Sequence, residues 1–239
     1  MKIYKFGGAS VRNAAGVRNL QHILSLSGGE TVVVISAMGK TTNALERVLE
    51  AVRQGDTVRA AEQWRDIVDY HTQIATELDI LQEAKALMSE MLAHINKVAG
   101  HTAHMEYDEQ YDQIVSMGEW LSTKLIVTYL QKQGLNCEWL DVAKLLRTDA
   151  TFRDANVDWE ASEQLLRAAI EDVKGKVYIA QGFIGGTEDG RRTTLGREGS
   201  DYTAAILANI LGAESVTIWK DVPGILNADP RLEENTVLI

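Results

Sequence analysis

The chain begins with Lys2-Ile3-Tyr4-Lys5-Phe6-Gly7-Gly8, a short, mostly apolar run that ends in two glycines. A second run, Thr31-Val32-Val33-Val34-Ile35-Ser36, is rich in β-branched residues and also ends in a small residue. Both runs have the length and composition of buried parallel strands. Between them, residues 13–27 carry apolar side chains at helical spacing, and Gly28-Gly29 stops that pattern. Together these segments predict a βαβ unit.

The rest of the chain continues the alternation around one long helical insertion. Residues 41–133 follow a helical pattern, with breaks expected near Gly55, Asp79, Gly100 and Asp108. The other expected elements are strands at 136–140, 177–182 and 215–219, helices at 158–173 and 200–211, a hairpin at 183–194, and turns at Pro223 and Pro230. The pattern predicts an α/β fold with a mainly parallel, helix-covered sheet. One domain is expected, because no linker-like stretch interrupts the chain.

The composition is that of a globular protein with a full core, since 45% of the 239 residues are hydrophobic and 24% are charged. The net charge of -10 repels polyanions, so nucleic acid is not an expected partner. No run reaches the roughly 18 apolar residues of a membrane helix, and the N-terminus does not resemble a signal peptide. The one cysteine, Cys137, cannot form an internal disulfide. We expect a cytoplasmic protein with no membrane partner.

The first candidate site is Lys5-Phe6-Gly7-Gly8-Ala9-Ser10, between the first strand and the following helix. Adjacent glycines let backbone N–H groups approach a ligand closely, and the helix start adds the positive end of its dipole. Such a turn suits phosphate. The alternative is a tight structural turn beside a solvated lysine.

The second candidate, Ser36-Ala37-Met38-Gly39-Lys40-Thr41-Thr42-Asn43, follows the second strand in the same way. Both turns therefore lie at the carboxyl ends of parallel strands, where open α/β sheets bind their ligands. The alternative for Thr41 or Thr42 is that it is only the N-cap of the next helix.

Two later segments direct charged side chains toward the same edge. Residues 193–201 place Arg197 between two glycines, where it can bind a carboxylate bidentately, and Ser200-Asp201 open a helix. Asp201 can instead be only a favourable charge in the first helical turn. Residues 218–231 add an acid and an arginine after the last strand. Glu119 is a lone acid on an otherwise apolar helix. Considered by itself, such a residue is more often a half-exposed surface acid than part of a site.

Taken together, these segments resemble the aspartate kinases, which phosphorylate the side-chain carboxylate of L-aspartate with ATP. The match runs the length of the chain and rests on residues 5–10, 36–43, 118–122, 193–201 and 220–231. Four positions depart from the family pattern: Ala9 replaces Thr, Glu198 replaces Gly, Lys220 replaces Thr, and Leu226 replaces an aromatic residue. The last two departures concern the adenine side, so contacts with the base or ribose can differ.

The resemblance implies a three-layer α/β/α sandwich, with aspartate over its N-terminal half and ATP over its C-terminal half. The residues that it assigns to ATP are Lys5, Gly7, Gly8, Lys220, Asp221, Leu226 and Arg231. Those that it assigns to aspartate, or to the organisation of the site, are Ser36, Thr42, Glu119, Arg197, Ser200 and Asp201. Lys5 and Asp201 are the implied catalytic pair. The implied product is 4-phospho-L-aspartate, the first intermediate in lysine, threonine and methionine biosynthesis.

Physical chemistry supports this assignment. A carboxylate acceptor is already ionised at neutral pH, so phosphoryl transfer to it needs no strong base and depends on holding two anions together. Lys5, the glycine N–H groups and Mg²⁺ can supply the neutralising charge. Arg197 can take the α-carboxylate and Glu119 the α-ammonium, while Asp201 holds Lys5. No cluster of carboxylates predicts a dedicated metal site, which fits Mg²⁺ carried by the nucleotide phosphates.

The resemblance also implies that residues 1–239 are a catalytic domain incomplete at its C-terminal end, without the family's regulatory ACT domains. A homo-oligomer is expected for the full-length parent. Two other functions stay open, namely a related amino acid kinase of the glutamate 5-kinase type and a non-catalytic nucleotide-binding fragment. The sequence leaves undecided whether the parent is fused to homoserine dehydrogenase and which amino acid inhibits it.

Overall fold

The computed structural model of the chain describes all residues except 28–29, 102–103, 171–174, 221–223 and 225. Among the described residues, five strands form the central sheet in the order β3-β4-β2-β1-β7. They are β1 (Lys2–Phe6), β2 (Thr31–Ile35), β3 (Cys137–Leu140), β4 (Val177–Gln181) and β7 (Ser215–Trp219). Each neighbouring pair is parallel, so the predicted α/β class and mainly parallel sheet are confirmed.

The register of the strands aligns their carboxyl ends. Phe6 at the end of β1 pairs with Ile35 on one side and with Trp219 on the other. Ile35 in turn pairs with Gln181 at the end of β4. The segments that follow β1, β2, β4 and β7 therefore leave the sheet at one edge, as the ligand-binding turns of open α/β sheets do.

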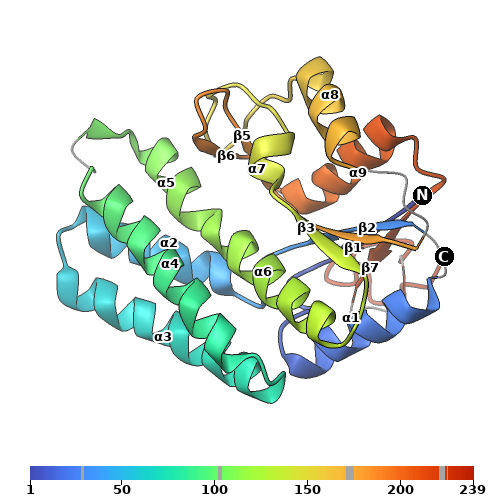
Figure 1. Cartoon of the computed structure of the whole chain (residues 1–239), viewed down its shortest axis with the longest axis horizontal. Coiled ribbons are helices and arrows are strands. Elements are labelled where there is room, and N and C mark those ends of the chain that lie inside the picture. The colour runs from blue at the N-terminus through green and yellow to red at the C-terminus, as the bar shows by residue number, and fades with distance from the viewer. Residues whose placement is uncertain (28–29, 102–103, 171–174, 221–223, 225) are drawn as a thin grey trace.

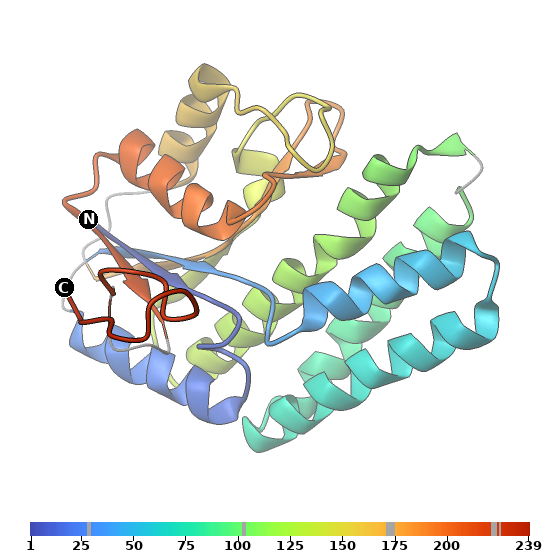
Figure 2. The same ribbon diagram turned by 180° about the vertical axis from the view of Figure 1, so that it is seen from behind.

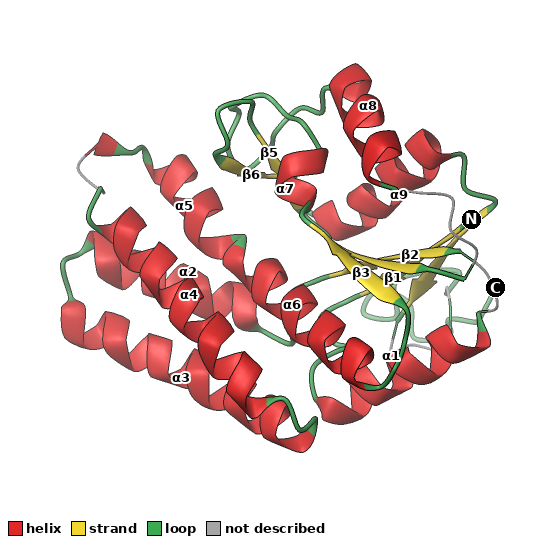
Figure 3. Cartoon of the chain, in the orientation of Figure 1, coloured by secondary structure: helices red, strands yellow, loops and turns green. Residues whose placement is uncertain are grey.

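Helices cover both faces of the sheet, as Figures 1 and 3 show. One face packs on α7 (Val142–Leu145), α8 (Trp159–Ala169) and α9 (Gly199–Leu211), and the other on α1 (Ala14–Leu26) and α6 (Met117–Lys132). Val32 and Val34 of β2 lie in the core on the α9 side, whereas Val33 and Ile35 lie in the core on the α6 side. This alternation along one strand confirms the three-layer α/β/α sandwich.

The helical insertion extends beyond the sheet, as the view from behind shows in Figure 2. It consists of α2 (Thr41–Arg53), α3 (Thr57–Glu77), α4 (Leu81–Ala99) and α5 (Tyr107–Val115), followed by α6. The predicted breaks near Gly55, Asp79 and Gly100 fall between these helices, and the predicted break near Asp108 falls at the second residue of α5, which begins at Tyr107. A further break at Ser116 was not predicted, because Ser116 keeps helical dihedral angles (φ -58°, ψ -18°) and the apolar periodicity continues through it.

The predicted hairpin is confirmed, with β5 (Ile184–Gly186) antiparallel to β6 (Arg192–Thr194). The helix predicted at 158–173 is α8, which ends at Ala169, whereas residues 171–173 of that prediction lie outside the described residues; the short helix α7 was not predicted. The predicted stop at Gly28-Gly29 and the turn at Pro223 lie outside the described residues. In the described part of the chain, no helix combines the length and the apolar character needed to cross a bilayer.

Candidate active site

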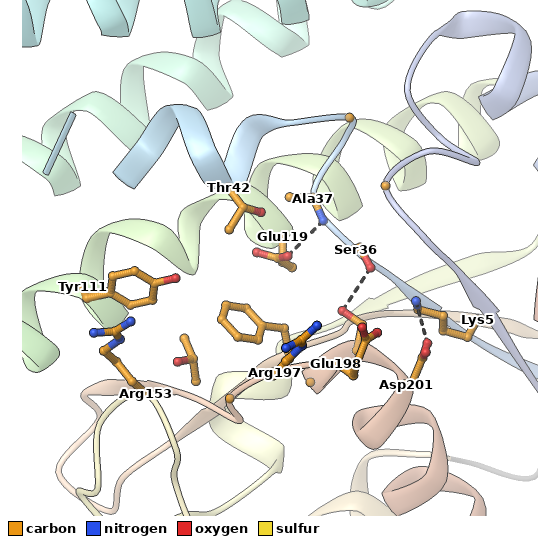
Figure 4. A pocket seen from close by; sticks show the side chains of 17 residues that line it. Lys5, Ser36, Ala37, Thr42, Tyr111, Glu119, Arg153, Arg197, Glu198 and Asp201 are labelled. Carbon is orange, nitrogen blue, oxygen red and sulfur yellow. Dashed lines mark hydrogen bonds and ion pairs between the residues drawn. The ribbon is translucent and has the colours of Figure 1, made fainter. Parts of the chain in front are cut away.

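A cavity of about 470 Å³ lies at the edge of the sheet where the strands end, between the loops after β1 and β2 and the segment before α9. It gathers eight of the predicted site residues (Figure 4). From the predicted ATP set these are Lys5 and Gly8, and from the predicted aspartate set Ser36, Thr42, Glu119, Arg197, Ser200 and Asp201. Predicted residues from four segments far apart in the sequence thus line one cavity.

Lys5 and Asp201 form an ion pair at one end of the cavity. The Nζ of Lys5 lies 2.6 Å from Oδ1 of Asp201, and Lys5 is only 6% exposed, so the alternative of a solvated lysine is wrong. Asp201 also lies in the first turn of α9, where a carboxylate is favoured by the helix dipole. Lys220 reaches the same carboxylate, with its Nζ 3.8 Å from Oδ2 of Asp201. A single carboxylate thus holds a buried and an exposed cation.

The glycine turn after β1 packs closely against the turn after β2. The backbone N–H of Gly39 donates to the carbonyl of Gly8 at 3.0 Å. A Cβ on Gly8 would lie 2.5 Å from the carbonyl oxygen of Ala37, which real structures do not tolerate. Gly8 therefore permits the two predicted anion-binding turns to form one wall of the cavity. Gly7 does not line the cavity, and a Cβ added to it would lie 3.7 Å from Nζ of Lys5.

Glu119 is the only carboxylate among the described residues that is buried in the cavity wall without a charged partner there. It is 3% exposed, so its half-exposed alternative is wrong. Its Oε1 accepts the N–H of Ala37 at 3.0 Å, whereas Oε2 has no hydrogen-bond partner in the described part of the chain. Burial raises the pKa of Glu119 to about 7. Gly118 lets the start of α6 approach the segment after β2 closely, because a Cβ on Gly118 would lie 3.0 Å from Cβ of Ala37.

The serine and threonine positions fall on the same wall. The hydroxyl of Ser36 donates to that of Ser200 at 3.0 Å, which ties the end of β2 to the start of α9. The N-cap of α2 is Lys40, so the alternative that Thr41 or Thr42 caps this helix is wrong. Thr41 instead donates its hydroxyl to the carbonyl of Met38 at 2.6 Å, and Thr42 lines the cavity (Figure 4).

Arg197 lies at the exposed mouth of the cavity, across from Glu119 (Figure 4). The next residue, Glu198, has a left-handed backbone (φ 57°) and is the N-cap of α9. Glycine adopts this conformation without strain, which explains why the resembling family has glycine there. Glu198 places a carboxylate next to Arg197 in the chain.

Three further residues of the predicted ATP set either lie apart from the cavity or fall outside the described residues. Arg231 is exposed and pairs with Asp229, with 2.7 Å between Nη2 and Oδ2. Leu226 bridges to Leu238 and does not line the cavity. Asp221 lies outside the described residues. The assignment of these residues to ATP stays a prediction.

The structure adds cavity residues that the sequence did not indicate. Arg153 lies over the ring of Tyr111, with 4.4 Å from its guanidinium carbon to the ring centroid, at the end of the cavity away from Lys5 (Figure 4). Thr194 and Phe183 also line the cavity. Arg153 has a left-handed backbone (φ 69°) without being glycine, so no turn residue marked its position.

The described residues contain no group of three or more His, Cys, Asp or Glu side chains able to hold a metal ion. The carboxylates that line the cavity also serve other partners, since Asp201 binds lysine and Glu119 accepts a backbone N–H. This donor set fits a divalent cation carried by nucleotide phosphates rather than by a protein cage.

Comparison with known proteins places the chain in a family. The model of the amino acid kinase family matches residues 1–239, so the chain belongs to the amino acid kinase family. Lysine-sensitive aspartokinase 3 of Escherichia coli K12 is 35% identical over 233 residues, which cover 96% of this chain and 51% of that protein. The aspartokinase of Chlamydia muridarum is 31% identical, over 99% of this chain and 52% of that protein.

Solved structures agree with the sequence comparison. The structure of E. coli aspartokinase III in complex with aspartate and ADP superimposes with a TM-score of 0.89 at 33% identity, over 100% of this chain and 53% of that chain. Isopentenyl phosphate kinase shares only the fold, with a TM-score of 0.54 at 16% identity. The chain spans about half the length of the aspartokinases it matches.

Proposed function

We propose that the protein is an aspartate kinase, which transfers the γ-phosphate of ATP to the β-carboxylate of L-aspartate. The observation that carries the proposal is the pairing of opposite recognition groups across one cavity. Glu119 and Arg197 both line the cavity, and one carboxylate oxygen of Glu119 has no hydrogen-bond partner among the described residues; Lys5 lies at one end of the cavity, near the glycine turn. An α-amino acid with a second carboxylate complements this arrangement.

The amino acid is oriented by its α groups. The Glu119 carboxylate accepts from the α-ammonium, and this contact satisfies the buried oxygen that has no hydrogen-bond partner in the described part of the chain. Arg197 binds the α-carboxylate with two parallel hydrogen bonds. With both α groups held, the β-carboxylate is free to face Lys5. Glutamate is one methylene longer and would place its side-chain carboxylate differently.

Lys5 stabilises the charge of the transferring phosphoryl group. Asp201 fixes its ammonium at 2.6 Å, so the positive charge needs no reorganisation when the phosphate arrives. Gly8 lines the same cavity as Lys5, so backbone N–H groups of the Gly7-Gly8 turn can add to this stabilisation. Mg²⁺, bound through the nucleotide phosphates, would neutralise further charge. No protein base is required, because the acceptor is already an anion.

Other observations support the same activity. Two proteins that are 31–35% identical to this chain over nearly its whole length are aspartokinases, and the structure of one related aspartokinase is a complex with aspartate and ADP. Lys220 contacts Asp201 through its ammonium, which favours a role near the phosphates rather than at the adenine. We also expect a homo-oligomer, which light scattering on the full-length protein can test.

A coupled assay of ADP release tests the proposal. The protein at its full length is supplied with MgATP and, in turn, aspartate, glutamate or N-acetylglutamate as acceptor. We expect turnover with aspartate alone. Preferred turnover with glutamate or N-acetylglutamate would assign the site to another amino acid kinase. Nucleotide binding without turnover on any acceptor would indicate a non-catalytic domain.

A further inference from the structure

Asp112 of α5 is a buried carboxylate that joins two segments of the cavity wall. It is 0% exposed and lies outside the motifs of the sequence analysis. Its Oδ2 accepts the backbone N–H groups of Arg153 at 2.9 Å and Thr194 at 2.8 Å, and its Oδ1 accepts the Thr194 hydroxyl at 2.7 Å. Arg153 and Thr194 both line the cavity. One side chain from the helical insertion thus anchors two loops that are 41 residues apart in the chain.

The neighbouring Gln113 adds two hydrogen bonds to β6, and we call Asp112 and Gln113 together the α5 clamp. Its amide nitrogen donates to the carbonyl of Arg192 at 2.8 Å, and its amide oxygen accepts the N–H of Arg192 at 3.3 Å. Asp112 and Gln113 together therefore bind alternate residues of β6, as the backbone of a partner strand would. Arg197 follows three residues after Thr194. The position of the Arg197 backbone consequently depends on contacts made by α5.

Arg153 needs such an anchor because its backbone is strained. A left-handed conformation (φ 69°) is unfavourable for a residue with a side chain, at a cost of about 1 kcal/mol. The guanidinium is held by the Tyr111 ring and by Asp108, whose Oδ1 lies 3.2 Å from Nη1. The hydrogen bond to Asp112 fixes the main chain. Strain that the surroundings maintain in this way is often found at functional sites.

The charge of Asp112 is itself unfavourable for folding. Burial raises its pKa to about 6, although the bonds to Arg153 and Thr194 oppose the rise. A carboxyl group whose pKa is raised by folding contributes stability at low pH that is lost as the pH rises through that pKa. At neutral pH the ionised carboxylate therefore costs stability. A neutral side chain would serve packing better, which points to a role in the site.

We propose that Asp112, supported by Gln113, is a positioning residue that sets the Arg153 loop and the segment leading to Arg197, and thereby the affinity for the amino acid substrate. This inference rests on the proposed function. Asp112 does not line the cavity, so it acts through the residues that it holds. It also explains why the helical insertion packs against the β5–β6 hairpin.

Several titratable and charged groups lie near the α5 clamp, and their effects must be distinguished from the titration of Asp112 in any study of pH dependence. The carboxylate of Glu46 accepts from the Tyr111 hydroxyl at 2.8 Å, and Nε2 of His94 lies 2.9 Å from the carbonyl of Gln113. Glu119, in the same cavity, titrates with a pKa of about 7. The groups near Asp112 and its neighbours are Glu46, His94, Asp108, Glu109, Tyr111, Glu119, Arg153, Arg191 and Arg192.

The test compares two substitutions of Asp112 in the full-length protein. In Asp112→Asn the amide oxygen can still accept both N–H groups while its nitrogen donates to the Thr194 hydroxyl, so aspartate binding should stay within about threefold. Asp112→Ala removes all three bonds, and we expect KM and Kd for aspartate to rise about 30-fold or more while kcat changes less than about threefold. Asp189→Ala, on the exposed tip of the same hairpin, is the matched control.

The pH profile separates positioning by hydrogen bonds from an effect of the Asp112 charge. Below about pH 6 the protonated carboxyl of Asp112 can keep Oδ2 as the acceptor of both N–H groups and donate from Oδ1 to the Thr194 hydroxyl, as the amide of Asp112→Asn does. The ratio of Kd for aspartate between wild type and Asp112→Asn should therefore stay constant within about threefold from about pH 5 to pH 8. Glu119 titrates in the wild type and in Asp112→Asn alike, so its contribution cancels in the ratio of their Kd values. Gln113→Ala provides a second variant should Asp112→Ala fail to fold, with binding about fivefold weaker expected.

The outcomes distinguish this inference from the proposed function. If the wild type binds no aspartate, the proposed function fails and the inference fails with it. If the wild type binds aspartate but Asp112→Ala or Gln113→Ala matches the control, only the inference is overturned. A loss in Asp112→Asn as large as in Asp112→Ala, or a ratio of Kd values between wild type and Asp112→Asn that changes more than about threefold between about pH 5 and pH 8, would also contradict it.

Discussion

Replacing Glu119 with glutamine should increase stability relative to the wild type at alkaline pH while it weakens aspartate binding. Glu119 is buried, and its pKa rises from 4.5 to about 7 on folding. Because folding raises this pKa, the stability that the group contributes is complete below 4.5 and is lost as the pH rises through 7. At about 1.4 kcal/mol for each unit of pKa, the loss is on the order of 3 kcal/mol, most of it between about pH 5 and pH 8.

The Glu119→Gln variant lacks this titration. Its amide oxygen can still accept the Ala37 N–H, so the local contact is kept. We expect the free energy of unfolding of the variant, minus that of the wild type, to grow by about 2–3 kcal/mol from about pH 5 to pH 8. All other titrating groups cancel in this difference. The neutral amide is a poor partner for an ammonium, so Kd for aspartate should rise about 10- to 100-fold.

Urea denaturation at the two pH values and calorimetric titration with aspartate measure these effects. Glu163→Gln on α8 is the control, since Glu163 forms an exposed ion pair with Arg167 and should change the unfolding free energy by less than about 0.5 kcal/mol at either pH. A stability difference between Glu119→Gln and wild type that does not change with pH would refute the buried, titrating carboxylate. Unchanged aspartate affinity would refute its role as the ammonium partner.

Three further predictions concern the cavity. Lys5→Met should lower kcat about 100-fold or more with little change in stability, since its charge is most needed in the transition state, and wild-type turnover would contradict this. Arg197→Lys should raise KM for aspartate, because an ammonium cannot reproduce a forked bond to a carboxylate; a rise confined to KM for ATP would reverse the two subsites. Gly8→Ala should weaken MgATP binding at least about tenfold, because its Cβ would lie 2.5 Å from the Ala37 carbonyl; unchanged affinity by calorimetry would show that the turn can shift freely.

Much of the fold was predictable because the strands carry their own signal. The β-branched run of β2 is buried along its whole length, as a central parallel strand is, and the glycines mark the ends of α2 and α4. The break at Ser116 was not predictable, because the sequence has no helix-breaking residue there and Ser116 itself keeps helical dihedral angles. The short helix α7 has only four residues, which is too few to show a period.

The site was predictable where a residue lies within a motif and unpredictable where tertiary contacts create it. Lys5 and Arg197 lie beside glycines at the ends of elements, so local sequence indicates them. Tyr111 and Arg153 enter the cavity only because α5 packs against a distant loop. Glu119 is buried by tertiary packing, which the local sequence does not show. The residues around it therefore favoured a half-exposed acid. Asp112 had no local signal for the same reason.

The most direct test of the account is to identify which carboxylate of aspartate receives the phosphate. Hydroxylamine traps an acyl phosphate as its hydroxamate, and chromatography separates the α- from the β-hydroxamate of aspartate. Since Glu119 and Arg197 are proposed to hold both α groups while Lys5 faces the side chain, the full-length protein with MgATP and aspartate should give only the β-hydroxamate. Formation of the α-hydroxamate, or of no hydroxamate while ATP is consumed, would contradict the proposed site.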